Sequence, residues 1–472
     1  MISRSERGNS LDQFLGYHSE WNLGSPGGWD YQRITQIIGK TIWESHIRKN
    51  SPDIHLDFDH PLLHPLNGFV SMLQEAHYSR KGSNPGLIAV VAEEETLEDV
   101  VENKNLVNRL NSIDGLTGAL MAPHELELQN GIVCWHGQPV SLIFMDFNTD
   151  VLLNLHRKHG LTPLLQAVRE RRVINPRGTE PINAKSMFEV ITDPGNPERF
   201  HTETIQRTPW TRQFYPRQTQ GPDGESIPEL VEWTRSNWEH LVLKPERGYS
   251  GKGVKVGGIN RDIDGIIDLA IKTGEYIVQK KVPLDLWAEM IPELDLENQE
   301  VKAARYQTDF RSFFGPNGLY GFLGRYGGVP TNVGSGGGVQ PLAVLRSDLS
   351  VGEATKRIND AILKMDFGDV MDAVENQKKM AMDHGLIYLL GPIKMALRPR
   401  LITTGQMKAI GAYCAGIWAD CRMMERMWLA GELNVRVNLD PEELAIIRSQ
   451  PWGGSPAIFA SDGLFSFGAH IQ

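Results

Sequence analysis

One segment of the chain combines residue types suited to binding a phosphate. It reads LVLKPERGYSGKGVKVGG over residues 241–258, and its apolar strand ends at Lys244. The loop that follows contains Gly248, Gly251 and Gly253 and leads into a second strand. Glycines let backbone N–H groups approach phosphate oxygens, and a lysine adds a positive charge. The spacing is not that of a Walker P-loop, in which a helix follows. The alternative is a glycine-rich hairpin beside a solvated lysine.

Two other segments carry residues that suit a nucleotide site. EYIVQKKV is an extended run containing Gln279, and its backbone groups could meet the edge of an adenine, although a plain core strand would read the same way. TDFRSFF places Asp309 and Arg311 on one face of a strand, and Arg325 is expected on the next strand. Two converging arginines suit an anionic group or a phosphoryl transition state. The alternative is a surface ion pair, which contributes little.

The segment HSEWNLGSPGG, residues 18–28, stands close to the start of the chain. Glu20 and Asn22 are alternate residues, so their oxygens would face the same way on a strand. Chain ends are usually frayed. A polar motif of this kind is therefore unexpected at this position.

Taken in order, these residues resemble the ATP-grasp carboxylate–amine ligases. The shared set is Lys185, Lys244 with its glycine loop, Gln279, the D-x-R of TDFRSFF, and an arginine followed by N-x-G-S-G-G-G. The likeness is to circularly permuted members, such as eukaryotic-type glutathione synthetase and the bacterial glutathionylspermidine-synthase-like proteins. Their E-x-N-x-x-S-x-x-G segment supplies magnesium ligands, and EWNLGSPGG matches it. Further likeness lies in GIVCWHGQPVSLIFMDF, VINPRGTEPINAKSMF, TPWTR and RPRLITTGQ.

The resemblance implies a role for each matching residue. Magnesium prefers oxygen ligands, and the implied ligands are Glu20, Asn22, Asp462 and Glu246. The transferring phosphoryl group or the acyl phosphate would be stabilised by Arg311 and Arg325. The residues that would contact ATP are Lys185, Lys244, Gly248, Tyr249, Ser250, Gly251, Gly253, Gln279, Lys281 and Val282.

The order of two segments departs from the family pattern. In related ligases a strand ending in an Asp-containing segment directly precedes the E-x-N strand, whereas here SDGLFSFGAHIQ stands at the other end of the sequence. A further circular permutation, cut between two adjacent strands, explains this order, because chain termini often lie close together. We therefore expect residues 469–472 beside residues 14–22, with Asp462 near Glu20 and Glu20 facing Lys244.

The elements that must position these residues indicate a mixed α/β and α+β fold. GLIAVVA is typical of a buried parallel strand, with a helix near 97–110 and the strand GALMA after it. Asn-Gly and His-Gly dipeptides then separate three short strands. Residues 50–85 look irregular, 150–172 helical, and 241–345 rich in strands and glycine. From 349 to 433 the pattern is helical, and Asp440 is the expected N-cap of a last helix.

The resemblance makes this a circularly permuted ATP-grasp fold with a pre-ATP-grasp α/β domain and a helical region. The expected divisions are 1–85 with the E-x-N strand, 86–184 as the pre-ATP-grasp domain, 185–348 as the nucleotide-binding region, 349–450 as the helical region, and 451–472 as the returning C-terminal strand.

Composition limits the classes of partner. The 472 residues carry 48 Lys and Arg against 58 Asp and Glu, a net charge of −10, with no basic block. Nucleic acid and anionic membranes are therefore not expected as partners. The 3 cysteines include no C-x-x-C pair, which argues against a disulfide framework or structural zinc and fits a reducing cytoplasm. The opening residues are polar and lack the apolar core of a signal peptide.

The resulting expectation is an ATP- and Mg²⁺-dependent ligase that forms an amide through an acyl phosphate and releases ADP and phosphate. Its partners would be a small carboxylate and an amine, such as an amino acid, a short peptide or a polyamine, and a homodimer is left open. Two alternatives also stay open: a kinase-like phosphotransferase, and a nucleotide-binding protein without amide formation. The regions expected to choose the substrates, 30–85 and the helical region, carry no readable motif.

Overall fold

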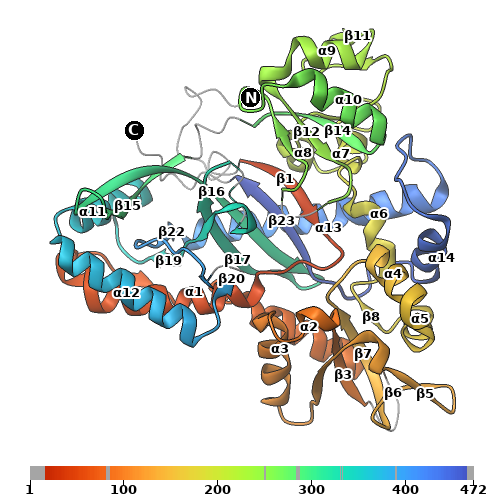
Figure 1. Ribbon diagram of the computed structural model, residues 1–472, viewed down its shortest axis with the longest axis horizontal. Helices are drawn as coiled ribbons and strands as arrows, with labels where there is room; N and C mark the ends of the chain where they lie inside the picture. The colour runs from red at the N-terminus through yellow and green to blue at the C-terminus, as the bar shows by residue number, and fades with distance from the viewer. Residues whose placement is uncertain are drawn as a thin grey trace.

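A computed structural model describes residues 16–80, 86–248, 251–282, 288–329, 331, 333–388 and 391–464. Figure 1 shows a large antiparallel sheet at the centre, a small sheet with two helices at one end, and a separate α/β unit at the other. Among the described residues, no helix has the length and apolar character needed to cross a membrane.

The central sheet has six strands in the order β1-β23-β16-β17-β18, with β15 paired to β16. Successive side chains of a strand point to opposite faces of its sheet, and β16 is buried on both. Phe313 joins the apolar cluster on one face, while Phe310 and Phe314 join the cluster on the other. The strands are β1 (Tyr17–Asn22), β15 (Ala288–Asp295), β16 (Glu300–Gly315), β17 (Gly318–Gly327), β18 (Gly338–Val339) and β23 (Phe459–Leu464).

Helices cover both faces of this sheet (Figure 1). The Phe313 face packs against helices from two parts of the chain, and the Phe310 face packs against the long helix α13 (Thr404–Ala430). The helices on the first face are α1 (Trp29–Ile42), α2 (Pro65–Ser79), α11 (Val351–Leu363) and α12 (Phe367–Asp383).

Helix α2 corrects the expectation that residues 50–85 are irregular. Pro65 occupies its first turn, where a proline costs no backbone hydrogen bond. Leu66, Phe69, Val70 and Leu73 are buried at helical spacing. The proline and histidine residues before the helix hid this apolar stripe.

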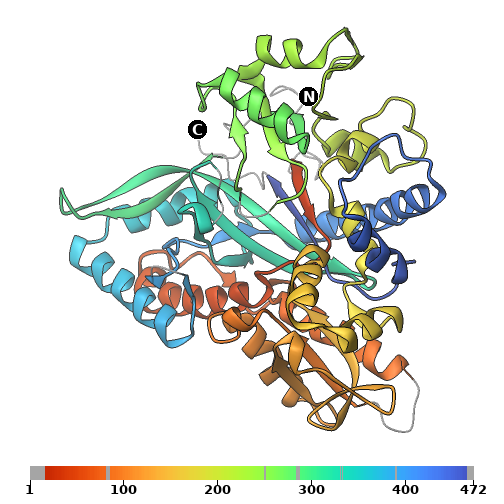
Figure 2. The same ribbon diagram turned by 45° about the vertical axis from the view of Figure 1, so that its right-hand side comes forward.

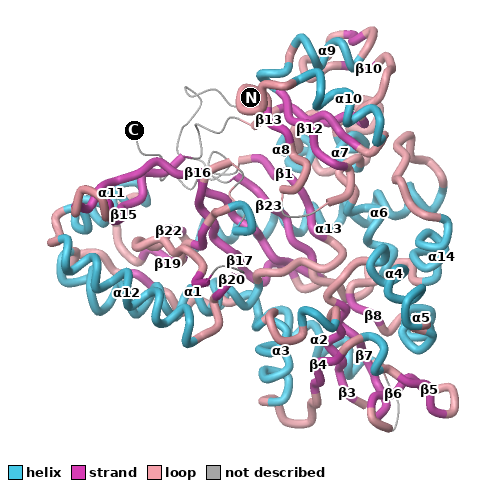
Figure 3. The backbone as a smooth tube through the Cα atoms, viewed as in Figure 1, coloured by secondary structure: helices cyan, strands magenta, loops and turns pink. Residues whose placement is uncertain are grey.

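The α/β unit matches its prediction closely. Strands β4, β3 and β7 are parallel neighbours, β8 is parallel to β7, and β5 and β6 extend the sheet as hairpins. Figure 3 shows helices flanking these strands. Asn130 and His136 both have positive φ, as the two predicted hairpin turns require. The elements are β3 (Leu87–Val91), α3 (Val101–Asn111), β4 (Gly118–Met121), β5 (Glu127–Gln129), β6 (Ile132–Trp135), β7 (Gln138–Met145), α4 (Thr149–His159), α5 (Thr162–Arg169) and β8 (Val173–Ile174).

The small sheet has the antiparallel order β13-β12-β14-β9 and lies next to β1 in both ribbon views (Figure 1, Figure 2). Helix α10 interrupts a stretch that we expected to hold only strands and glycine. The Asp262 side chain caps it, and Ile266, Ile267 and Ala270 bury one side. The elements are β9 (Thr211–Gln213), α9 (Leu230–Ser236), β12 (Leu241–Pro245), β13 (Lys255–Val256), α10 (Ile263–Thr273) and β14 (Tyr276–Lys280).

The helical region is also interrupted by short strands. Helix α14 (Pro441–Ser449) begins as predicted, with the Asp440 carboxylate accepting a hydrogen bond from the Glu442 N–H (2.8 Å). The unpredicted strands are β20 (Ile387–Tyr388), β21 (Gly391–Pro392) and β22 (Arg400–Ile402), of which β22 joins β19 (Leu342–Leu345) and β2 (Leu56–Asp57) in a three-stranded sheet.

Candidate active site

Five charged side chains gather on one face of the central sheet because of strand register. Strands β1 and β23 are antiparallel neighbours, and Glu20 pairs with Asp462. Asp462 in turn pairs with Arg311 of β16, and Asp309 pairs with Arg325 of β17. Directly paired residues share a face. The proximity of Asp462 to Glu20, expected from the rewired chain order, is therefore found, while residues 14–15 and 469–472 lie outside the described residues.

Asp462 joins the two arginines. Its carboxylate accepts hydrogen bonds from Arg311 Nε and Nη2 at 2.7 and 2.8 Å, and Arg325 Nη2 lies 3.2 Å away. Burial alone would raise the pKa of Asp462, but the two guanidinium groups outweigh it and hold this pKa well below its usual range. Arg325 also forms a bidentate pair with Asp309 at 2.7 and 3.0 Å. Both arginines are therefore fixed in orientation.

Lys244 faces this cluster from the small sheet. Its Nζ donates to Gln279 Oε1 (2.7 Å) on β14 and to the Ser19 carbonyl (3.2 Å) on β1. Burial lowers the pKa of Lys244 to about 8, with Glu20 opposing this shift and Lys185 adding to it. Gln279 is held by Thr211 of β9, to whose hydroxyl it donates (2.9 Å). The two predicted ATP contacts Lys244 and Gln279 thus touch each other beside the E-x-N strand.

Lys185 connects that strand to the glycine loop. Its Nζ lies 3.4 Å from Glu20 Oε2 and donates to the Gly248 carbonyl (3.1 Å). Gly251 and Gly253 have φ of 71° and 76°, a conformation that L side chains rarely adopt. Tyr249 and Ser250, also predicted to contact ATP, lie outside the described residues.

Glu246 is buried and makes its contacts within the protein. Its carboxylate accepts a hydrogen bond from the Ser186 hydroxyl and one from the Asn438 N–H (3.4 Å). Burial raises its pKa, although these two donors oppose the shift. It lines a small cavity together with Asn22 and Lys185. Its part in a metal site stays a prediction, and its observed contacts are those of a positioning residue.

Lys281 and Val282 follow β14 and line two cavities, of about 480 and 710 Å³. The Lys281 N–H donates to the His240 carbonyl (2.8 Å), and its Nζ donates to the Gly257 carbonyl (3.0 Å). These contacts place both residues at the edge of the small sheet. Their predicted contact with adenine stays a prediction.

The donor set at the E-x-N strand fits a magnesium ion that also binds phosphates. Mg²⁺ takes one or two carboxylates and completes its shell with phosphate oxygens and water. Glu20 is 27% exposed, and the Asn22 amide lies beside it with Nδ2 3.4 Å from Asp462 Oδ2. Asp462 is already neutralised by two arginines. In the part of the chain that the structure describes, no group of three His, Cys, Asp or Glu residues could hold a metal by itself.

Sequence reasoning gave no role to His18, which lies two residues before Glu20. Its imidazole is fully buried, contacts the Tyr413 hydroxyl and lies 2.8 Å from the Thr208 hydroxyl. Burial, with Arg207 and Lys244 adding to it, lowers its pKa to about 3, so the ring is neutral. Two motifs could have indicated this contact: TPWTR, which contains Thr208, and HSEWN, which begins with His18.

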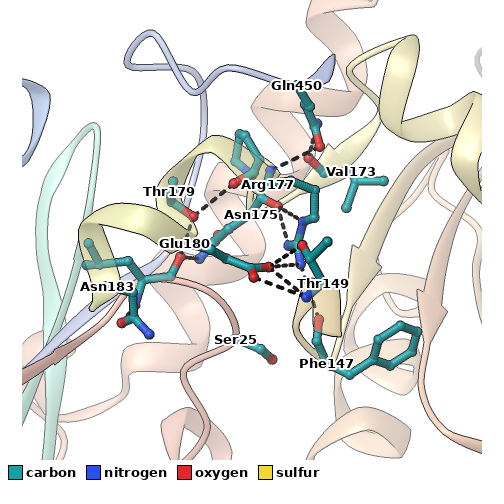
Figure 4. Close-up of polar contacts among 12 residues, drawn as sticks. Ser25, Phe147, Thr149, Val173, Asn175, Arg177, Thr179, Glu180, Asn183 and Gln450 are labelled. Atoms are coloured by element: carbon teal, nitrogen blue, oxygen red, sulfur yellow. Dashed lines mark hydrogen bonds and ion pairs between the residues drawn. The ribbon is translucent and has the colours of Figure 1, made fainter. Parts of the chain in front are cut away.

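A second group of polar contacts, centred on Arg177 and Glu180, is shown in Figure 4 and lies beside the residue that follows β1. Arg177 and Glu180 form a buried ion pair (2.7 Å). The amide of Asn175 and the hydroxyl of Thr179 both donate to the Leu23 carbonyl, each at 2.8 Å. The segment VINPRGTEPINA, which directly precedes Lys185, therefore fixes the position of Leu23, the residue next to Asn22.

No known protein family profile and no curated protein matches the chain. Among solved structures, it is similar to a glutathione synthetase-like effector from Globodera pallida, with 13% identity over 65% of this chain and 61% of the effector, at a TM-score of 0.37. A RimK domain ATP-grasp protein from Sphaerobacter thermophilus is 16% identical over 50% of this chain and 71% of its own, at a TM-score of 0.28. The macrocyclase MdnC from Microcystis aeruginosa, bound with its precursor peptide MdnA, is 9% identical over 62% of this chain and 83% of its own, at a TM-score of 0.30. Because these TM-scores are below 0.5, a function for the chain has to rest on the residues of its own cleft.

Proposed function

We propose that the chain is an ATP- and magnesium-dependent carboxylate–amine ligase of the circularly permuted ATP-grasp type, related to glutathione synthetase and the glutathionylspermidine-synthase-like proteins. One observation carries the proposal. Lys185 and Lys244 both reach the E-x-N strand, beside the face that bears Arg311 and Arg325. Phosphoryl transfer depends on positioned cations more than on a nucleophilic side chain.

In the proposed reaction, a carboxylate oxygen attacks the γ-phosphorus of ATP, and ADP leaves. The amine nitrogen then attacks the carbonyl carbon of the acyl phosphate, phosphate leaves, and the nitrogen loses a proton to give the amide. Lys185, Lys244 and the glycine loop bind the phosphates. Arg311 and Arg325 would orient the transferring group and neutralise its charge, and exclusion of water from the site would favour the amine as the attacking group.

The cofactor assignments follow from the same cleft. Glu20 and Asn22 would hold Mg²⁺, whereas Asp462 and Glu246, which the motifs also imply as ligands, already use their carboxylates in contacts within the protein. The ion, when bound, neutralises charge on the phosphates. The adenine would meet the chain at the end of β14, through Gln279 and the backbone of residues 281–282.

The remaining expectations belong to this proposal. The nucleotide-binding region would be 185–348, after a pre-ATP-grasp domain at 86–184, and the substrates would be an amino acid, a short peptide or a polyamine joined to a second small molecule. A cytoplasmic enzyme with no nucleic-acid or membrane partner, and with a homodimer left open, completes it.

ADP release tests the proposal. Wild-type chain is screened with ATP, Mg²⁺ and pairs of amino acids, short peptides, polyamines and glutathione, and the products are identified by mass spectrometry. Lys244→Ala should abolish turnover. Lys272→Ala, which alters an exposed lysine of helix α10 beside the same small sheet, should not. Turnover that survives Lys244→Ala overturns the assignment.

The same screen separates the alternatives. A phosphorylated acceptor without an amide indicates a kinase-like phosphotransferase. Binding of ATP and Mg²⁺ without ADP release from any pair indicates a nucleotide-binding protein. An amide product together with stoichiometric ADP supports the ligase.

A further inference from the structure

A cavity of about 610 Å³ lies behind the strand that carries Arg325. Tyr326 lines this cavity, whereas Arg325 points to the opposite face and its carboxylate partners. The other walls come from β15, helix α12 and the segment 392–397. Its volume and its largely apolar walls are those of a small-molecule site. None of the residues assigned to the proposed ATP site lines it.

One end of the cavity is built to hold an ammonium group. Lys394 Nζ lies 4.6 Å from the centroid of the Tyr306 ring and 5.5 Å from that of Tyr326. The two rings meet edge to face, at 5.1 Å and 87°. The same Nζ lies 2.9 Å from the Tyr306 hydroxyl and 3.8 Å from the Glu293 carboxylate, to which that hydroxyl donates. Two aromatic faces and a carboxylate are the groups that recognise organic cations.

Lys394 uses only part of this site. Its side chain is 50% exposed, whereas Tyr326 is almost wholly buried. Ile291, Val374 and Leu397 line the rest of the cavity. A ligand that joins an ammonium group to an apolar body would use both the ring cage and these walls.

The charge balance favours a cation over an anion. Lys378, the other lysine that lines the cavity, is already paired with Glu375 at 2.9 Å. If the Lys394 head moves into solvent, Glu293 loses the cation that lies 3.8 Å from its carboxylate, because Lys302, its cross-strand partner, is already paired with Asp295 at 2.7 Å. An incoming ammonium restores that pairing, and a carboxylate would not.

We propose that this cavity binds an alkylammonium ligand, meaning an organic cation with an apolar chain, and that Lys394 occupies the ammonium position when the ligand is absent. The site is separate from the proposed ligase cleft. Its test needs no nucleotide, so its outcome is independent of that function.

Titration calorimetry of the full chain with n-hexylammonium tests the proposal, with hexan-1-ol as the uncharged control. The ammonium should bind and the alcohol should bind at least about tenfold more weakly, since cation–π and carboxylate contacts are lost. Lys394→Met should tighten n-hexylammonium binding about tenfold by removing the internal competitor. Lys378→Met is the matched control and should leave binding unchanged.

Two conservative variants identify the groups that recognise the cation. Glu293→Gln should weaken n-hexylammonium binding about tenfold, because it removes the carboxylate charge that would face the ligand. Tyr306→Phe keeps the ring but loses the hydroxyl that lies 2.9 Å from the ammonium position, and it should weaken binding less than Glu293→Gln does. Equal binding of hexan-1-ol and n-hexylammonium, or unchanged affinity in Lys394→Met, would overturn the proposal. A loss in Tyr306→Phe larger than that in Glu293→Gln would also overturn it, because recognition would then depend mainly on the hydroxyl and not on the ring and the carboxylate.

Discussion

Two charged networks in this molecule, one around Arg177 and Glu180 and the other around Glu20 in the candidate site, differ in how many hydrogen bonds their carboxylates accept and in how far they are exposed to solvent. In the Arg177 network, the Glu180 carboxylate accepts from the Thr149 N–H, the Thr149 hydroxyl and Arg177. Arg177 also donates to the carbonyls of Asn175 and Phe147. Both side chains are sealed from solvent. In the cleft, by contrast, Glu20 is partly exposed and has a lysine neighbour at 3.4 Å.

The two networks also differ in the number of charged groups that they bring together. The Arg177 network pairs one cation with one carboxylate. In the candidate site, Lys185, Lys244, Arg311 and Arg325 lie near Glu20, Asp309 and Asp462, and Glu246 lines the same small cavity as Lys185. A saturated pair stabilises the fold, whereas several cations around a partly exposed carboxylate suit an anionic ligand.

The largest expected effect is on stability and comes from the saturated network. Arg177→Met leaves the Glu180 charge buried without its partner, which should cost about 3–5 kcal/mol and lower the melting temperature sharply. Thermal unfolding followed by circular dichroism measures this. Arg177→Met combined with Glu180→Leu should recover most of the loss. A melting temperature equal to that of wild type in Arg177→Met would remove the contrast between the two networks.

In the cleft, the expected effect is on chemistry. Arg311→Lys keeps the charge but loses the two parallel hydrogen bonds to Asp462 and the one to the Gly27 carbonyl (2.8 Å). ADP release should fall by about a hundredfold with little change in melting temperature. A variant that melts early and keeps its activity would instead group Arg311 with Arg177.

Magnesium dependence separates two carboxylates that the motifs group together. Glu20→Gln should raise the Mg²⁺ concentration needed for half-maximal ADP release about tenfold, because an exposed oxygen ligand loses its charge. Glu246→Gln should leave that concentration unchanged and lower the melting temperature, since its carboxylate holds Ser186 and Asn438. The reverse pattern would make Glu246 the metal ligand.

The smallest effect is a dependence of ATP affinity on pH. Because burial lowers the pKa of Lys244 to about 8, this amine is charged below that pH and neutral above it. ATP affinity should therefore fall severalfold between pH 7 and 9, and Lys244→Met should flatten the curve. The unfolded chain keeps the ordinary, higher pKa and binds more protons in this range, so stability from this group rises with pH. A joint fall of affinity and stability would contradict the assignment to Lys244.

Local patterns predicted the parts of the fold that depend on neighbours in sequence. The apolar run of β3 and the Asn130-Gly131 turn indicated the α/β unit because strand burial and turn geometry are local properties. Helix α2 and helix α10 were missed, because prolines before one and a glycine within the other resemble breaks in structure.

The candidate site was predictable only where a motif carried it. The pairing of Glu20 with Asp462 joins residues more than 440 positions apart, and it was inferred from the resemblance and the rewired chain order. The contact of His18 with Tyr413 joins residues 395 positions apart, which no local spacing encodes. Arg177 and Glu180 are only three residues apart, but their complete burial depends on tertiary packing. The Lys394 cage is likewise formed by three separate segments.

The most direct measurement of the central claim is equilibrium binding of ATP and Mg²⁺ to the full chain. It compares wild type with Lys244→Ala, on strand β12 of the small sheet, and with Lys272→Ala, on the neighbouring helix α10. We predict that wild type and Lys272→Ala bind alike and that Lys244→Ala binds at least about tenfold more weakly, since it loses a charge-assisted contact to phosphate. Equal binding by Lys244→Ala and wild type would contradict the proposed ATP site.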